Sequence, residues 1–383
     1  MTYVGIDIEQ FVRDPYGSGI QRVLQYLARE WPADVAQADF VIPMDGGHGL
    51  LRPEQAAELI SVPFEPRDPQ DDLRDLVSAK IADLRPIRVR PGDLLSIYDS
   101  WLLPEVSYLP SVLQRFELFA KCVPTAMIGY DTLPMSEPAN YRFKPGTAAW
   151  VSEYFRHLAT ADSVVAISAY ARDSILGRLR RDPALAMTVA HPGGDHVPIA
   201  PGNPPQGASR PRFLRVGTLE ARKRPQELLT AFRKAAARGL EAELVFVGGK
   251  SASDEAINDD VTRATAEGIG VTWIQGASDA EVASLISSAS AFLSIGVEGY
   301  GIPVLEAIRL GTPVLYDGIQ PAGELMQGSG ARRIDALDEA GLVEAFTTYS
   351  QPTALAELRG ELQPAHVPTW RDFAVSVARG AVV

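Results

Sequence analysis

Short apolar runs rich in valine and isoleucine alternate along the chain with longer stretches whose apolar residues recur at helical spacing. This alternation is typical of βαβ units built on a mostly parallel sheet. One series of such units runs from Tyr3 to His191, and a second starts at Phe213. The pattern therefore predicts an α/β protein with two doubly wound domains.

The first series predicts both strands and helices. Its clearest strands are Tyr3–Ile8, Leu94–Tyr98, Thr125–Tyr130, Ser163–Ile167 and Thr188–Ala190. Its helices are expected near Ile20–Glu30, Thr147–Ala161 and Ala169–Arg180, with a further one at Asp72–Leu84.

The second series has the same alternation. Its predicted strands are Phe213–Gly217, Glu243–Val247, Gly270–Ile274, Ser290–Ser294 and Pro313–Tyr316. Its predicted helices are Pro225–Arg238, Asp254–Glu267, Ala280–Ser288 and Ile302–Leu310.

A stretch rich in proline and glycine separates the two series, as expected of an interdomain linker, because these residues disfavour helix. We therefore place an N-terminal domain at 1–195, a linker at 196–212 and a second domain at 213–365.

Composition narrows the class of protein. Of 383 residues, 46% are apolar and 22% charged, which is typical of globular chains, and the net charge is −12. An acidic balance argues against nucleic acid or anionic lipid as a partner. The single cysteine, Cys122, excludes an intrachain disulfide framework. The sequence has no apolar run of about 18 residues and no secretory signal, so we expect a cytoplasmic protein.

Candidate chemistry gathers after the strands of the second series. Arg222, Lys223 and Arg224 follow the strand that ends at Gly217, where cations can neutralise phosphate oxygens. Further on, Glu298 and Glu306 flank a glycine-containing turn in EGYGIPVLEA. An exposed basic turn and ordinary helix-start carboxylates are the simpler explanations of each segment taken alone.

Several segments together resemble the retaining glycosyltransferases of the GT4 family. They are EGYGIPVLEA at 298–307, VGTLEARKR at 216–224, WIQGASDAEVASLISSASAFLS at 273–294, GIQR at 19–22, YDTLP at 130–134 and AISAYARDSIL at 166–176. The resemblance covers nearly the whole chain and is nearest to a bacterial mannosyltransferase-like branch.

This resemblance implies a GT-B fold, in which two Rossmann-like domains flank an interdomain cleft. The second domain would hold a nucleotide-sugar donor, and the first would hold the acceptor. It also implies that a C-terminal helix within 366–383 crosses back to the first domain.

The resemblance further implies roles for donor-side residues. Arg222 and Lys223 would hold the diphosphate and stabilise the leaving group, and Glu298 would contact the donor sugar. Glu306 would bind the ribose hydroxyls. Backbone amides at Gly19, Gly301 and Ile302 would complete the cradle, and Ile274 would lie near the base. No cofactor and no metal ion is expected.

The acceptor side is less clearly defined. Asp131 is the best carboxylate there, with a turn aspartate as the alternative, and Ser18 and Arg172 are further candidates. Many relatives have a histidine just before this aspartate, whereas this chain has Tyr130. The five histidines do not form a zinc motif, and His191 and His196 are expected in a solvated hinge.

The resemblance favours transfer of a mannose-like hexose, from a GDP-sugar by preference, to a soluble glycan or small-molecule acceptor. A lipid-linked glycan is the alternative acceptor, so membrane contact would be peripheral at most. Two other classes stay open: a nucleotide-sugar epimerase or phosphorylase, and a catalytically silent nucleotide-sugar binding protein.

Overall fold

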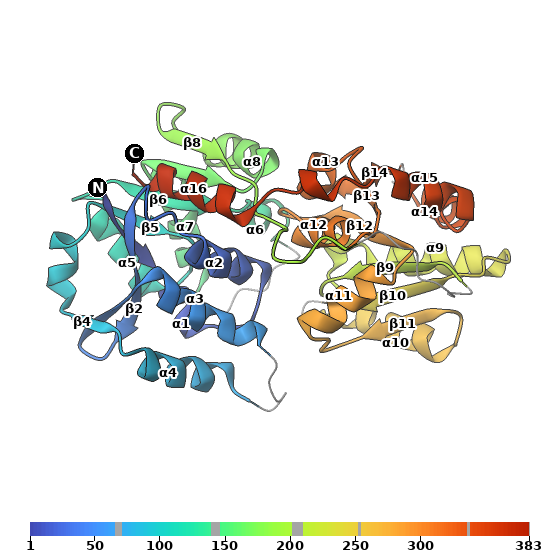
Figure 1. The fold of residues 1–383 in the computed structure, drawn as a ribbon, viewed down its shortest axis with the longest axis horizontal. Helices are drawn as coiled ribbons and strands as arrows, with labels where there is room; N and C mark the ends of the chain where they lie inside the picture. Colours follow the sequence, from blue (N-terminus) through green and yellow to red (C-terminus); the bar gives the residue numbers. More distant parts are fainter. Residues whose placement is uncertain (66–70, 139–145, 201–209, 252–253, 335–337, 383) are drawn as a thin grey trace. The chain divides into compact units, whose positions relative to one another are not determined.

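The computed structural model describes residues 1–65, 71–138, 146–200, 210–251, 254–334 and 338–382. The chain forms two compact units (Figure 1). The N-terminal unit comprises Met1–Thr132, Phe143–Pro192 and Thr369–Val383. The C-terminal unit comprises Leu133–Arg142 and Gly193–Pro368. The main division falls after Pro192, three positions before the boundary expected from sequence, and most of the expected linker lies outside the described residues.

The N-terminal unit is built on an eight-stranded sheet with the order β4-β3-β2-β1-β5-β6-β7-β8. The strands in the part of the sheet ordered β2-β1-β5-β6-β7-β8 run parallel to one another. At the other edge, β3 pairs antiparallel with both β2 and β4. The strands are β1 (Tyr3–Asp7), β2 (Gln37–Met44), β3 (Gly47–Leu51), β4 (Ile87–Val89), β5 (Ser100–Leu103), β6 (Thr125–Gly129), β7 (Ser163–Ala166) and β8 (Ala186–Val189).

One predicted strand in this unit is wrong. Residues Leu94–Tyr98 are not a strand, because Pro91–Ser96 forms a 3₁₀ helix and the strand follows it as β5. Both segments are apolar, and periodicity does not distinguish two short apolar runs. Pro91 favours the helical start, and Trp101 of β5 is fully buried. The strands β2, β3 and β4 were not expected from the sequence.

The helices of this unit agree closely with the sequence where they were expected. Asp72, Ser18 and Ser168 cap α4, α2 and α8 by accepting hydrogen bonds from backbone amides. The α-helices that this unit draws from the chain before the C-terminal unit are α1 (Glu9–Arg13), α2 (Gly19–Arg29), α3 (Pro53–Ser61), α4 (Leu73–Leu84), α5 (Pro110–Phe119), α7 (Ala148–Thr160) and α8 (Ala169–Leu179).

The C-terminal helix α16 (Trp370–Ala381) belongs to the N-terminal unit, although the whole C-terminal unit precedes it in the chain. It packs on β5, β6, β7 and α2 (Figure 1). Trp370 is 2% exposed and stacks on Tyr26 of α2, with ring centroids 4.9 Å apart. At the other end of α16, Gly380 lies so close to Val165 of β7 that a Cβ added to Gly380 would be 2.5 Å from a methyl group of Val165.

The C-terminal unit has a six-stranded, fully parallel sheet with the order β11-β10-β9-β12-β13-β14. Its strands are β9 (Arg212–Val216), β10 (Glu243–Val247), β11 (Val271–Ile274), β12 (Ala291–Val297), β13 (Val314–Ile319) and β14 (Ala331–Arg333). Its α-helices are α6 (Leu133–Ser136), α9 (Pro225–Ala237), α10 (Glu255–Ala266), α11 (Asp279–Ser287), α12 (Ile302–Arg309), α13 (Pro321–Leu325), α14 (Glu339–Thr348) and α15 (Pro352–Gly360).

The order of this sheet places the site. Strands β9, β12 and β13 are neighbours, and the carboxyl ends of parallel strands meet at one edge. The turn after β9 and the loop after β12 therefore lie together, although about 75 residues separate them in sequence. Among the described helices, none is both long and apolar enough to span a lipid bilayer.

Replacing Trp370 by alanine should lower the free energy of unfolding by about 3–5 kcal/mol, because it removes a buried aromatic ring from between α16 and α2. Urea unfolding monitored by circular dichroism measures this loss. Leu118→Ala is the control, since Leu118 is 48% exposed and its truncation should change stability by less than about 0.5 kcal/mol. Equal effects of the two changes would contradict the packing role of α16.

Candidate active site

Two cations and one carboxylate expected from sequence converge at the sheet edge of the C-terminal unit. Arg222 and Lys223 lie on a 3₁₀ turn, Ala221–Lys223, after β9, and Glu298 directly follows β12. Arg222 Nη1 is 3.0 Å from Glu298 Oε2, and Lys223 Nζ is 3.0 Å from Glu298 Oε1. Arg222 also donates to the Val297 carbonyl at 2.6 Å. The loop after β12 thus fixes the orientation of the basic turn.

The charges in this cluster shift one another's ionisation. Burial alone would raise the pKa of Glu298, but Lys223, Arg222 and Arg215 together lower it to about 2. Burial lowers the pKa of Lys223, and the charge of Glu298 opposes that shift. The carboxylate is therefore ionised at neutral pH and surrounded by cations.

Arg215 is a member of the cluster that the sequence analysis missed. It lies on β9, and its Nη2 is 3.9 Å from Glu298 Oε1. An arginine inside the otherwise apolar segment RFLRV is the signal that could have identified it. Burial lowers the pKa of this guanidinium, and Glu298 opposes that shift. A charge placed in a buried strand is costly unless it is paired, so it indicates a site rather than core packing.

Glycines allow the backbone segments to approach at this edge. A Cβ on Gly296 would lie 2.1 Å from the carbonyl oxygen of Arg222, and one on Gly217 would lie 2.8 Å from Lys223 Nζ. Both glycines have positive φ, +99° and +124°. Substitution at Gly296 would therefore displace the backbone of the basic turn, whereas a Cβ at Gly217 would meet the end of the Lys223 side chain.

Arg224 also has positive φ, +54°, and immediately precedes α9. Its Nη1 is 3.9 Å from Oδ2 of Asp317, a fully buried carboxylate on β13. This pair connects the basic turn to a third strand end, which separates Arg224 from the cluster around Glu298.

The second carboxylate, Glu306, lies on α12 and is not part of the Glu298 cluster. Its Oε1 is 2.8 Å from Nε2 of His196. The expectation that His196 belongs to a solvated hinge is wrong, because its side chain is buried against this carboxylate. Helix α12 begins at Ile302 after Gly301, whose φ is +105°, and among the described residues no side chain caps it. Ile274 ends β11, where its carbonyl accepts from the amide of Gly248.

The acceptor-side candidates lie in the N-terminal unit. Tyr130 is buried, and its hydroxyl donates to the carbonyl of Pro104 at 2.8 Å. Burial raises the pKa of Tyr130 well above its usual value. The structure therefore gives Tyr130 a packing role and does not present its hydroxyl to a ligand.

The other acceptor-side candidates are more accessible. Asp131 is half-buried just after β6. Gly19, a donor-side candidate in the same unit, is exposed and would have open space around a Cβ. Ser18 accepts from the amide of Gln21 as the cap of α2. Arg172 pairs with its neighbour Asp173 at 2.8 Å.

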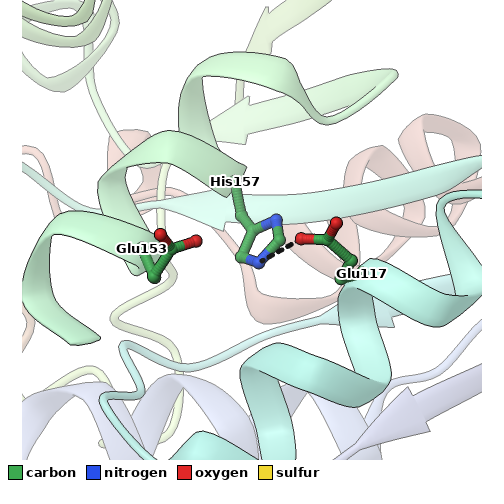
Figure 2. Close-up of side chains that lie close together, drawn as sticks. All are labelled: Glu117, Glu153 and His157. Atoms are coloured by element: carbon green, nitrogen blue, oxygen red, sulfur yellow. Dashed lines mark ion pairs between the residues drawn. The ribbon is translucent and has the colours of Figure 1, made fainter. Parts of the chain in front are cut away.

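A second cluster of ionisable groups lies between α5 and α7 of the N-terminal unit. Glu117, Glu153 and His157 point toward one another, with ligating atoms within 4.8 Å of one another (Figure 2). Arg156 pairs with both glutamates, and its Nε is 2.7 Å from Glu153 Oε2. Its Nη2 is 3.4 Å from His157 Nε2. An arginine thus supplies the positive charge that a metal ion would bring to these carboxylates.

The sequence is similar to known glycosyltransferases. Residues 203–327 match the family model of glycosyl transferases group 1. The chain is 25% identical over 264 residues to the serotype-specific mannosyltransferase WbdA of Escherichia coli, covering 63% of this chain and 31% of that protein. It is 26% identical over 183 residues to the O-antigen chain mannosyltransferase B of Escherichia coli, covering 45% and 48%. The matches thus span less than half the length of these curated relatives.

Solved structures show the fold. Anabaena Alr3699/HepE, in complex with UDP and glucose, aligns with a TM-score of 0.64 and 15% identity over 99% of this chain and 98% of that one. WaaG, a glycosyltransferase of lipopolysaccharide biosynthesis, aligns with a TM-score of 0.60 and 15% identity over 99% of both chains. The GT-B fold and the glycosyltransferase resemblance predicted from the sequence are confirmed.

Replacing Gly296 by alanine should destabilise the C-terminal unit by about 1–3 kcal/mol from the positive φ alone, and further through the contact with Arg222. Gly268→Ala is the matched control, since Gly268 has φ +67° and open space around its Cβ. Thermal unfolding of both variants separates backbone strain from the contact. A smaller loss for Gly296→Ala than for Gly268→Ala would contradict the close approach of the basic turn to β12.

Proposed function

We propose that this chain is a retaining glycosyltransferase that transfers a hexose from a nucleoside-diphosphate sugar to a glycan hydroxyl without a metal ion. The observation that supports this most directly is the convergence of Arg222, Lys223 and Glu298 at one edge of the C-terminal sheet. The match of residues 203–327 to a glycosyltransferase family includes all three of these residues.

The chemistry follows from the charge that develops in the reaction. Breaking the anomeric C–O bond leaves positive charge on the sugar and negative charge on the departing diphosphate. Cations that are already fixed beside that phosphate stabilise the transition state more than the ground state. In this proposal Arg222 and Lys223 have that role, and Glu298 contacts the donor sugar.

The remaining donor contacts are proposed at the other strand and helix ends. The ribose hydroxyls would bind Glu306, whose carboxylate is oriented by His196. Amides at Gly301 and Ile302, at the start of α12, would donate to phosphate oxygens. Ile274, at the end of β11, would lie beside the base.

Relatives support the sugar and the acceptor class. Two matched relatives are named mannosyltransferases, which supports mannose as the sugar and GDP as the first nucleotide to test. The structural neighbour in complex with UDP and glucose supports a nucleotide-sugar donor and makes UDP the second. The name O-antigen chain mannosyltransferase supports a glycan acceptor, soluble or lipid-linked, bound on the side of Asp131, Ser18 and Arg172.

Retention is proposed to occur by attack on the same face of the sugar as the leaving group. The departing phosphate would accept the proton of the acceptor hydroxyl while Arg222 and Lys223 hold its charge. A covalent glycosyl adduct on Glu298 or Asp131, trapped with a slow fluorosugar donor, would contradict this mechanism.

Nucleoside diphosphates should raise the melting temperature selectively. A ligand at 100 times its dissociation constant adds about 2.7 kcal/mol to the stability of the folded state. Thermal-shift titrations with GDP, UDP, dTDP and ADP measure this effect. Lys223→Met removes one charge-assisted contact and should weaken the preferred nucleotide about 10- to 100-fold.

Lys234→Met is the control for that titration, because Lys234 is an exposed cation on α9 that pairs with Glu339. It should leave nucleotide affinity unchanged. Stabilisation by none of the four nucleotides, or equal weakening by both lysine variants, would remove the support for a donor site at this cluster.

Product analysis separates the enzyme classes. The wild type should transfer the sugar only when acceptor is present, with the donor's anomeric configuration retained by NMR, and should work in EDTA. Glu298→Gln should keep nucleotide binding and lose about 100-fold or more in turnover. Conversion of donor to an epimer without acceptor would favour the epimerase class, and binding without any turnover would favour a silent binding protein.

A further inference from the structure

Arg215 is an unusual residue for a buried strand. It lies on β9, its side chain is only 5% exposed, and among the described residues its Nη2 has no hydrogen-bond partner. The carboxylate of Glu298, at 3.9 Å, is the acidic group it approaches. A buried guanidinium with an unsatisfied nitrogen is costly, so a compensating role is expected.

The cluster around Glu298 has an outer and an inner layer. Arg222 and Lys223 are the outer cations, with side chains 15% and 12% exposed. Both also lie near a second carboxylate, Glu220, at 2.5 Å and 4.0 Å. Arg215 is the inner cation. The outer pair is partly exposed to an arriving anion, whereas the Nη2 of Arg215 is buried.

A diphosphate that binds the outer cations competes with Glu298 for them. The carboxylate would then lose the two contacts at 3.0 Å that hold it in the free protein. An ionised carboxylate at a buried position is unstable without a partner, and it would take up a proton or move. A third cation that the ligand does not reach would prevent both outcomes.

We propose that Arg215 is a positioning residue that holds the Glu298 carboxylate in place once the donor's diphosphate has engaged Arg222 and Lys223. This inference rests on the proposed function of the site. The electrostatics agree with it, because Arg215 already contributes to the lowered pKa of Glu298 in the free protein. Arg215 therefore acts through Glu298 and does not touch the donor.

The test compares Arg215→Met and Arg215→Lys with Arg212→Met. Arg212 is the matched control, since it lies on the same strand and pairs with Glu243 at the opposite, amino-terminal end. Arg215→Met should lower kcat at least about tenfold while nucleotide affinity changes little. Arg215→Lys should recover part of kcat, and Arg212→Met should leave it unchanged. In the Glu298→Gln background, Arg215→Met should cause no further loss.

The pH profile distinguishes positioning from packing. Loss of Arg215 should move the acid limb of kcat to higher pH, because Glu298 in the donor complex would then take up a proton more easily. Arg222 and Lys223, which pair with Glu298, and Glu220, which pairs with both of these cations, are unchanged in this variant. An unshifted acid limb, or nucleotide affinity weakened as much as in Lys223→Met, would overturn the proposal, the latter by making Arg215 a direct phosphate ligand.

A measurement without activity separates this inference from the proposed function. Arg215→Met should lower the melting temperature more in the wild-type background than in the Glu298→Gln background, because the charges of Arg215 and Glu298 attract each other. The same cycle with Arg215→Lys covers the case in which the methionine variant does not fold. If the effects of the Arg215 and Glu298 substitutions on melting temperature are additive, the role of Arg215 is overturned even if sugar transfer is established. If the two effects are coupled but no sugar is transferred, only the proposed function is contradicted.

Discussion

The contact between Glu298 and its cations constrains the whole C-terminal unit. The carboxylate follows β12, and the cations come from β9 and from the turn after it, so the contact requires these strands to be parallel neighbours. Since the groups are largely removed from water, each charge needs the others. Gly296 is required at the same edge because a Cβ there would lie 2.1 Å from the carbonyl oxygen of Arg222 in the basic turn.

The N-terminal unit has a comparable ionic cluster whose groups stabilise the fold. Asp7 ends β1, Glu9 begins α1, and Arg115 of α5 pairs with both at 2.8 Å. The amide of Glu9 donates to Asp7, and the hydroxyl of Ser111 donates to Glu9. These carboxylates already accept from several donors and hold the strand-to-helix turn in place. In the cluster around Glu298, by contrast, the inner cation Arg215 approaches the carboxylate only to 3.9 Å, and its Nη2 has no hydrogen-bond partner among the described residues.

Much of the fold was predictable because the C-terminal unit follows the simplest rules. Strand β10 has the predicted bounds, and α9, α10, α11 and α12 differ from prediction by one residue at their ends. A buried parallel sheet gives uninterrupted apolar runs between amphipathic helices. The N-terminal edge was not predictable in this way. There β2, β3 and β4 pair antiparallel, and an apolar run ending at Tyr98 folds as a 3₁₀ turn beside the true strand.

The sequence by itself determined the two α/β units and the motif residues Arg222, Lys223 and Glu298, because propensity, periodicity and spacing are local properties. Tertiary structure alone decided which charges meet. In the folded chain Tyr130 is buried and donates a hydrogen bond to the Pro104 carbonyl. His196 pairs with Glu306, and Arg215 lies in the cluster around Glu298. Burial and distance between residues far apart in the chain set these pairings, and no local pattern encodes them.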